Sequence, residues 1–369
     1  MIWILVLLVT VLPSFLISFF SVAVVRQAAK PLGLMDKPGH RKIHVTPIPL
    51  GGGLGIWAGL VGTFALGTAA IFIDESVWKP IGPLNPLSIH LPGLREKVAE
   101  IWVLLLGATI LMLLGLADDR SGLRWQVRLV VEVVVAAGIV YWQGLQLTAF
   151  IDLPWLTGLM SVLWIVALIN SFNMLDNMDG LSGGVAAIAA SILALMLILQ
   201  PDPGTRQPQL FVAAMLLVLV GSLLGFLKHN WPPASIFMGD AGSYLVGYWI
   251  AIATLLTTYT GYQGQTPHAI LAPLCVLAIP LYDMCSVIWI RLREGRSPFE
   301  GDKRHFSHRL VDLGLSKKSA VLTIYLATLT CGLGALLLNR TDIVGAGVVV
   351  LMVAAVISLI AILESRTTG

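Results

Sequence analysis

Long apolar segments separated by short polar ones run along most of the chain. A bilayer core needs about 20 mainly apolar helical residues per crossing, and eleven segments approach that length. Because they are continuously apolar rather than alternating, they predict helices and not the strands of a membrane barrel. We therefore expect an all-α integral membrane protein with about eleven transmembrane helices. These are residues 2–25, 51–73, 98–117, 127–143, 156–172, 181–200, 209–227, 241–259, 267–290, 319–338 and 342–363.

The composition agrees with this pattern and excludes an ordinary soluble domain. Apolar residues make up 57% of the 369 residues and charged residues only 12%, a balance that is foreign to soluble proteins. The first segment has no basic residue before it and is longer than a signal-peptide core, which favours a membrane anchor over a cleaved signal. Without an internal repeat or a soluble domain, residues 1–369 are expected to form one membrane domain.

The basic residues predict the orientation of the chain. Of its 23 Lys and Arg residues, 18 fall in one set of alternate loops and five in the other. Positive charge marks the cytoplasmic side of a membrane protein. The N-terminus is therefore expected outside and the C-terminus in the cytoplasm.

Almost every unusual polar residue lies on the same basic side, so we expect a site that faces the cytoplasm. The loops that would form it are approximately residues 26–50, 118–126, 173–180, 228–240 and 291–318.

Two adjacent carboxylates, Asp118 and Asp119, end the third apolar segment. Carboxylates that repel each other beside hydrocarbon are expected to bind a cation, hold a proton or pair with a base. The alternative is ordinary loop charge that pairs with Arg120 and Arg124.

A second polar group follows the fifth segment. In a helix Asn170, Asn173 and Asp176 share one face, because they recur at three-residue intervals. Asp179 comes just before the next segment, where it could instead cap a helix. A polar face of this size at a membrane boundary indicates a ligand.

Asp240 lies between glycines just before the eighth segment. Its carboxylate suits a hard cation, and the free N–H groups of a helix N-terminus suit a phosphate. A simple helix cap explains the residue equally well.

Two basic loops complete the candidate site. Arg304, His305 and His308 belong to a dense cluster of hydrogen-bond donors that suits phosphate or pyrophosphate. Anionic lipid headgroups are an alternative partner, and the spacing of the two histidines without a nearby Cys disfavours zinc. Lys42 and His44, followed by three glycines, also suit an anionic ligand, although positive-inside charge explains them nearly as well.

Together these loops restrict the chemistry. Oxygen ligands without Cys indicate Mg2+, or Mn2+, rather than a softer metal. Clustered basic residues and helix N-termini indicate a phosphorylated substrate. The combination predicts phosphoryl transfer at the membrane surface.

At this point the chain resembles the polyprenyl-phosphate N-acetylhexosamine-1-phosphate transferases. The motifs occur in the family's order over residues 36 to 308. They are Asp36-x-Pro, Arg41-Lys42-x-His44, Asp118-Asp119, Asn170-x-x-Asn173-x-x-Asp176-x-x-Asp179-Gly180-Leu181, Met238-Gly239-Asp240-x-Gly242-Ser243 and His305-x-x-His308.

The resemblance implies transfer of a sugar-1-phosphate from a UDP-N-acetylhexosamine to undecaprenyl phosphate, with release of UMP, as the first membrane step of cell-surface polysaccharide synthesis. The branch that acts on the muramyl pentapeptide carries three consecutive histidines, and His305-Phe306-Ser307-His308 is more similar to the branch that uses UDP-N-acetylglucosamine. Another UDP-HexNAc donor is the alternative. Two residues depart from the family: Asn177 replaces a Gly and Leu50 replaces a basic residue.

The resemblance also implies roles for these residues. Mg2+ would be held by Asp240 and Asn173 with Asp118 nearby, while the lipid phosphate attacks in line. A covalent intermediate on Asp119 or Asp118 is the alternative. The expected catalytic residues are Asp118, Asp119, Asp176, Asp179 and His305, and the expected substrate-binding residues are Lys42, His44, Asn170, Arg304 and His308.

Two other classes of protein remain as rivals. An ion-coupled transporter would place its acids in mid-span and show repeated halves, and a scaffold would not need so many acids on one face. We expect a multi-pass protein of the bacterial inner membrane with UDP-N-acetylhexosamine, undecaprenyl phosphate and membrane lipid as partners. We expect no nucleic acid and allow for a homodimer.

Overall fold

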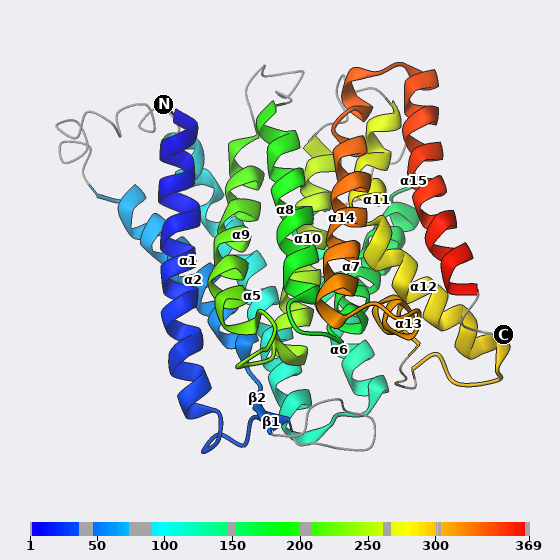
Figure 1. Ribbon diagram of the computed structural model, residues 1–369. Coiled ribbons are helices and arrows are strands. Elements are labelled where there is room, and N and C mark those ends of the chain that lie inside the picture. The colour runs from blue at the N-terminus through cyan, green and yellow to red at the C-terminus, as the bar shows by residue number, and fades with distance from the viewer. Residues whose placement is uncertain are drawn as a thin grey trace.

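Helices follow the apolar segments in the computed structural model, which describes residues 2–36, 47–73, 91–145, 153–199, 209–260, 267–299, 301 and 304–365. The long helices stand side by side, with α10 among them (Figure 1). They are α1 (Ile2–Ala28), α2 (Gly52–Ile71), α5 (Leu91–Ser121), α6 (Trp125–Gln143), α7 (Pro154–Leu175), α8 (Leu181–Leu199), α9 (Leu210–Asn230), α10 (Gly239–Thr260), α14 (Lys317–Ala335) and α15 (Ile343–Ser365).

Shorter elements lie between the long helices. Three of them, η2, α11 and α12, replace one of the predicted continuous spans. The short elements are β1 (Met35–Asp36), β2 (Ile48–Pro49), η2 (Pro267–Leu271), α11 (Ala272–Val276), α12 (Ala278–Arg293), α13 (Phe306–Asp312) and η3 (Leu338–Arg340).

Within the described ranges, nine helices are long and apolar enough to cross a membrane. They match nine of the eleven predicted segments, so the all-α membrane architecture is confirmed, whereas the count of eleven is not. The predicted segment 241–259 is helical as α10, but it is rich in buried aromatic residues such as Tyr244, Tyr248 and Trp249. The predicted segment 267–290 is broken at Leu277, between α11 and α12.

The packing of α1 against α9 relies on small residues. A side chain added at Gly221 would lie 2.0 Å from Ser14 Oγ, and one added at Gly225 would lie 2.5 Å from the carbonyl oxygen of Phe15. The Ser18 hydroxyl donates to the Ser222 carbonyl oxygen at 2.7 Å. Close backbone approach and polar contacts between helices are how membrane helices associate, because lipid is as apolar as their side chains.

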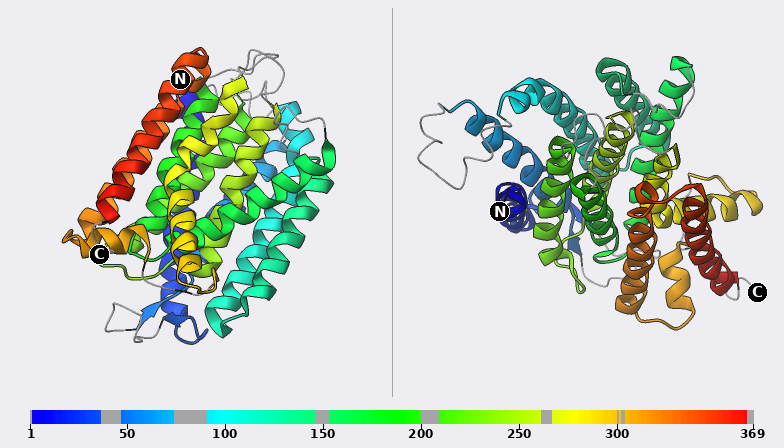
Figure 2. Two further views of the ribbon diagram at one scale, coloured as in Figure 1. Left: turned by 90° about the vertical axis from the view of Figure 1, so that its right-hand side faces the viewer. Right: turned by 90° about the horizontal axis from the view of Figure 1, so that it is seen from above.

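The outer surface of the bundle also suits lipid. Large apolar side chains lie exposed on several helices, among them Ile343 (76% exposed) and Leu351 (69%) on α15. A continuous apolar surface of this kind is unstable in water. Two further views show α15 at the periphery of the bundle (Figure 2).

A small hairpin lies at one end of the bundle, below α2 in Figure 1. Its strands are antiparallel, with Met35 opposite Pro49. The Phe237 N–H donates to the Pro49 carbonyl oxygen at 2.9 Å, and the Gly52 N–H donates back to Phe237 at 2.9 Å. The hairpin therefore joins the start of α2 to the segment that leads into α10.

Candidate active site

The carboxyl ends of α5 and α7 meet the amino end of α10 at the end of the bundle that carries the hairpin. Two glycines allow α5 and α2 to lie close to the start of α10. A side chain added at Gly115 of α5 would lie 2.3 Å from the Asp240 carbonyl, and one added at Gly53 of α2 would lie 2.5 Å from Gly242 Cα. The first turn of α10 thus packs directly on the backbones of two other helices. This packing brings the predicted acids together.

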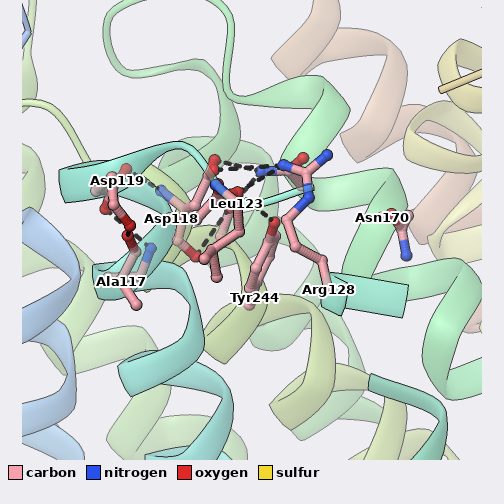
Figure 3. Close-up of polar contacts among 12 residues, drawn as sticks. Ala117, Asp118, Asp119, Leu123, Arg128, Asn170 and Tyr244 are labelled. Atoms are coloured by element: carbon pink, nitrogen blue, oxygen red, sulfur yellow. Dashed lines mark hydrogen bonds and ion pairs between the residues drawn. The ribbon is translucent and has the colours of Figure 1, made fainter. Parts of the chain in front are cut away.

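Asp118 lies buried in this junction (Figure 3). Its Oδ2 accepts a hydrogen bond from Arg128 Nη1 at 2.6 Å and one from the Tyr244 hydroxyl at 3.2 Å. Its Oδ1 accepts from the Leu123 N–H at 2.6 Å. The carboxylate therefore ties the end of α5 to α6 and α10 and, above all, fixes the Arg128 guanidinium.

Asp119 caps α10 from a neighbouring helix. Its two oxygens accept the N–H groups of Asp240 at 2.9 Å and of Ala241 at 3.2 Å. Free N–H groups at a helix N-terminus attract a carboxylate. Asp119 thus fixes the position of Asp240, a role that the sequence did not suggest.

Gly239 is required where Asp119 meets α10. Its φ of +71° lies in the left-handed region, and an added Cβ would lie 2.5 Å from Asp119 Oδ2. We expect Gly239→Ala to lower the melting temperature and to cost at least about 1 to 3 kcal/mol through backbone strain and this clash. Thermal unfolding in detergent measures it, with Gly347→Ala as the control because an added Cβ there meets nothing within 4 Å. Equal melting temperatures for the two variants would contradict the assignment.

Asp240 is more accessible than Asp118. Its side chain is 30% exposed, against 5% for Asp118. Asn173 Nδ2 donates to Asp240 Oδ1 at 2.7 Å and lies 3.1 Å from Ser243 Oγ. The two residues that the sequence analysis assigned to a metal are therefore neighbours, joined across α7 and α10.

Arg128 was not predicted to be a site residue. It was only one of the basic residues that predicted the orientation of the chain in the membrane. Its Nη1 lies 2.6 Å from Asp118 Oδ2 (Figure 3) and 3.8 Å from Asp240 Oδ2. The signal in the sequence was its position ten residues after Asp118. Arg128 lies in the first turn of α6, which begins four residues after α5 ends. It places a guanidinium, the group best suited to phosphate, beside the accessible carboxylate.

Asp176 ends α7 and completes the acidic group. Burial, together with the charges of Asp119 and Asp179, raises the pKa of Asp176 to about 8, although the Gly239 N–H donates to this carboxylate and opposes the shift. Asp179 Oδ2 accepts the Ala234 N–H at 2.9 Å. With a pKa of about 8, Asp176 holds its proton through much of the neutral pH range, and a bound cation nearby would favour its ionised form.

Asn230, at the end of α9, holds the turn that carries these acids. Its Oδ1 accepts the Gly180 N–H at 2.8 Å, and its Nδ2 donates to the Ile236 carbonyl oxygen at 2.8 Å. The Tyr325 hydroxyl donates to the carbonyl oxygen of Gly180. The turn is thus fixed from α9 and α14, and Asn230 is a further residue that the sequence analysis missed.

Asn170, predicted to bind substrate, lies apart from the carboxylates in Figure 3. Its Nδ2 donates to Glu132 Oε2 at 2.5 Å and to the Val166 carbonyl oxygen at 2.9 Å. Glu132 is buried within α6. Asn170 therefore joins α6 to α7, and its predicted contact with substrate stays a prediction.

His305 is the N-cap residue just before α13, and its Nδ1 lies 2.9 Å from Oδ2 of Asp283. Asp283 is fully buried, and its Oδ1 accepts the Phe306 N–H at 2.6 Å. The Ser307 hydroxyl donates to Asn177 Oδ1, which places α13 against the turn that follows α7. Asp283 was missed because it lies in the middle of an apolar segment.

We expect Asp283→Asn to lower kcat by about 10- to 100-fold, because a misplaced catalytic group loses reactive geometry and the buried carboxylate fixes the tautomer of His305. Steady-state kinetics of Asp283→Asn, His305→Gln and the double variant measure the effect. If the two residues act together, the double variant is no worse than His305→Gln. Additive losses would contradict this pairing.

Four other residues, Arg304, His308, Lys42 and His44, were predicted to bind substrate. The Arg304 guanidinium pairs with Glu294, and the His308 ring centre lies 6.4 Å from that of His305. Lys42 and His44 lie outside the described residues. In the described part of the chain, no three His, Cys, Asp or Glu side chains form a metal-binding group, so the predicted Mg2+ ligands stay a prediction.

Comparison with known proteins identifies the same family that the motifs resemble. The glycosyl transferase family 4 model matches residues 101–258, a range that includes Asp118, Asp119, Asn173, Asp176 and Asp240. A probable undecaprenyl-phosphate N-acetylglucosaminyl 1-phosphate transferase of Bacillus subtilis is 31% identical over 91% of this chain and 87% of its own length.

Two further relatives have similar names. A decaprenyl-phosphate N-acetylglucosaminephosphotransferase of Mycobacterium tuberculosis is 32% identical over 96% of this chain and 88% of its own length. An undecaprenyl-phosphate alpha-N-acetylglucosaminyl 1-phosphate transferase of Escherichia coli K12 is 29% identical over 82% of this chain and 76% of its own length. The chain therefore belongs to glycosyl transferase family 4, the family of the polyprenyl-phosphate N-acetylhexosamine-1-phosphate transferases that its motifs resemble.

Proposed function

We propose that this protein transfers N-acetylglucosamine-1-phosphate from UDP-N-acetylglucosamine to a polyprenyl phosphate such as undecaprenyl phosphate, and releases UMP. The observation that carries the proposal is the junction of α5, α6, α7 and α10, where Arg128 lies between the Asp118 and Asp240 carboxylates at one end of a membrane bundle. A lipid phosphate and a water-soluble nucleotide can meet only at such an end. The names of the relatives support the choice of N-acetylglucosamine.

The reaction is a displacement at phosphorus. An oxygen of the lipid phosphate forms a bond to the β-phosphorus of the donor, and the bond from that phosphorus to the bridging oxygen breaks. UMP leaves with the electron pair of that bond. Catalysis of this kind needs alignment of the reacting groups and stabilisation of negative charge rather than covalent chemistry by the protein.

Residues of α6 and of the segment beside α13 can provide this alignment and charge stabilisation. Arg128, held by Asp118 at 2.6 Å, can donate to a phosphoryl oxygen and stabilise developing charge. His305, held by Asp283 at 2.9 Å, can donate to the pyrophosphate or the leaving phosphate from α13. Asp176 and Asp179, on the turn after α7, are proposed to position the nucleotide or the sugar.

The donor set suits a hard cation. Asp240 and Asn173 are adjacent, Asp118 is close by through Arg128, and these oxygen ligands favour Mg2+ or Mn2+. When bound there, the cation would neutralise the charge of the donor pyrophosphate. The accumulation of carboxylates that otherwise repel one another supports its presence.

A covalent intermediate on an aspartate is the alternative mechanism. Both oxygens of Asp119 accept backbone N–H groups of α10, and both oxygens of the buried Asp118 are also hydrogen bonded. A carboxylate used in this way is a weaker nucleophile and has less freedom to approach phosphorus. Direct attack by the lipid phosphate is therefore the mechanism we propose.

The acids lie at helix ends rather than in mid-span, which favours an enzyme over an ion-coupled transporter. The excess of basic residues on the same side supports an active site on the cytoplasmic face of the bacterial inner membrane. The step would initiate a cell-surface polysaccharide. A homodimer stays a prediction.

The test is release of UMP by purified protein given UDP-N-acetylglucosamine, undecaprenyl phosphate and Mg2+, measured by liquid chromatography and mass spectrometry. We expect UMP to form only when the lipid and the divalent cation are both present. UDP-N-acetylgalactosamine and the UDP-muramyl pentapeptide serve as alternative donors. Turnover with one of these but not with UDP-N-acetylglucosamine would contradict the proposed sugar, and no turnover with any donor would contradict the activity.

A further inference from the structure

The last helix, α15, ends at a buried polar network beside α13. Glu364 is 4% exposed although it lies in a helix that is otherwise apolar. Its Oε2 accepts the Tyr282 hydroxyl at 2.7 Å and lies 3.2 Å from Arg309 Nη2. Arg309 is itself buried, and its Nη2 also donates to the Ser286 hydroxyl at 2.8 Å.

This network joins three helices. Tyr282 and Ser286 belong to α12, Arg309 to α13 and Glu364 to α15. The left view of Figure 2 shows the end of α15 beside α13. A buried ion pair is costly unless its partners are further hydrogen bonded. Here Glu364 also accepts from Tyr282 and Arg309 Nη2 donates to Ser286, whereas the buried Arg309 Nε has no hydrogen-bond partner among the described residues.

The same two helices, α12 and α13, carry the pair described above. Asp283 follows Tyr282 in the sequence, and His305 is four residues before Arg309, one helical turn away. The Tyr282 ring also meets the Phe306 ring edge to face, with centres 6.2 Å apart. The Glu364 network and the Asp283–His305 pair are therefore two connections across the same interface between α12 and α13.

We propose that Glu364 is a positioning residue for His305, which acts by fixing Arg309 and Tyr282 and so the orientation of α13. This inference rests on the proposed function only in assigning His305 a role in the transfer. It predicts that loss of the Glu364 carboxylate changes the position of α13 and lowers turnover. Substrate binding by the α5, α7 and α10 acids is expected to change little.

The structural test is independent of activity. Spin labels at Asp312→Cys on α13 and Gln126→Cys on α6 are compared by double electron–electron resonance; both residues are exposed. The exposed Cys285 is replaced by Ser, whereas Cys275 and Cys331 are buried. We expect Glu364→Gln to broaden or shift the distance distribution.

Val353→Ala is the matched control, because Val353 is a buried residue of the same α15 helix that is outside the network. It loosens the packing of α15 without removing the carboxylate. We expect its distance distribution to match that of the parent protein. An unchanged distribution in Glu364→Gln, or the same change in both variants, would overturn the proposal.

The kinetic test separates positioning from binding. We expect Glu364→Gln to lower kcat by about 10- to 100-fold, the loss typical of a misplaced catalytic group, with little change in KM for either substrate. Tyr282→Phe removes one hydroxyl and leaves the ion pair, so it guards against misfolding of the charge variant and is expected to cause a smaller loss of the same kind. Wild-type kcat in Glu364→Gln would overturn the proposal.

The two tests separate this inference from the proposed function. A changed label distance in Glu364→Gln, together with wild-type protein that releases no UMP from any donor, would contradict the transferase activity while supporting the role of Glu364 in orienting α13. Activity in the wild type, with no effect of Glu364→Gln on the label distance or on kcat, would support the transferase activity and contradict the role of Glu364.

Discussion

Replacing Asp240 with Asn is expected to lower kcat by about a thousandfold or more, the largest effect of any single change considered. Its carboxylate is more exposed than that of Asp118, with Asn173 Nδ2 at 2.7 Å and Arg128 Nη1 at 3.8 Å. The change keeps the size of the side chain but removes a charge that a divalent cation would need. Single-turnover measurement of UMP release over a range of Mg2+ concentrations tests it.

Asp342→Asn is the matched control for this variant. Asp342 is an exposed residue near the start of α15, where its Oδ1 accepts the Gly345 N–H. Asn caps a helix about as well as Asp does, so activity and stability should both be retained. A folded Asp240→Asn protein with near-normal kcat would contradict the role assigned to Asp240.

Asp118→Asn is expected to lower both activity and stability. The change leaves Arg128 without its carboxylate partner at 2.6 Å, in a junction where the Asp118 side chain is only 5% exposed. Breaking a buried ion pair costs about 3 to 5 kcal/mol, and the partial exposure of Arg128 (28%) places this pair at or below the lower end. We expect kcat to fall by about 100- to 1,000-fold, because the guanidinium is no longer held where charge develops.

Activity measured together with stability separates Asp118 from Asp119. Asp119→Asn keeps one carbonyl oxygen for the first turn of α10 and is expected to lower the melting temperature as its main effect. If Asp118 acts through Arg128, the variant Arg128→Gln should lose a similar factor in kcat, and the double variant should lose little more. Independent, additive losses would contradict the pairing.

Most of the chain's helices could be predicted from the sequence, because lipid requires long apolar runs whose backbone hydrogen bonds form within the helix. Two segments show the limits of that argument. The run 267–290 is predominantly apolar, yet it breaks at Leu277, and hydropathy alone carries no signal for such a break. The helix α10 carries buried tyrosines and a tryptophan, since it packs against other helices rather than lipid.

The acids of the site could be predicted because charge beside hydrocarbon is costly and is retained only with a partner or a ligand. Their individual roles could not. Asp118 and Asp119 are adjacent in the sequence, but one holds Arg128 and the other caps α10. Which neighbour each oxygen meets depends on the close approach of α5 to α10 at Gly115, which sequence spacing does not contain.

Two buried acids were not predicted as site residues, because sequence spacing does not show which distant residues meet in the fold. Asp283 and Glu364 each lie in an apolar segment, and their partners are 22 and 55 residues away in sequence, at His305 and Arg309. An acid in an apolar helix is itself a signal, because its charge requires a partner. That signal identifies the acid but not the partner.

The most direct test of the central claim is to follow the donor's β-phosphate. UDP-N-acetylglucosamine labelled with 32P at that position is incubated with the purified protein, undecaprenyl phosphate and Mg2+, and the lipid and aqueous products are separated. The account predicts that the label enters the lipid fraction together with the sugar and that the released UMP is unlabelled. Labelled UDP in the aqueous fraction with unlabelled glycolipid would mean transfer of the sugar alone, and it would contradict sugar-1-phosphate transfer.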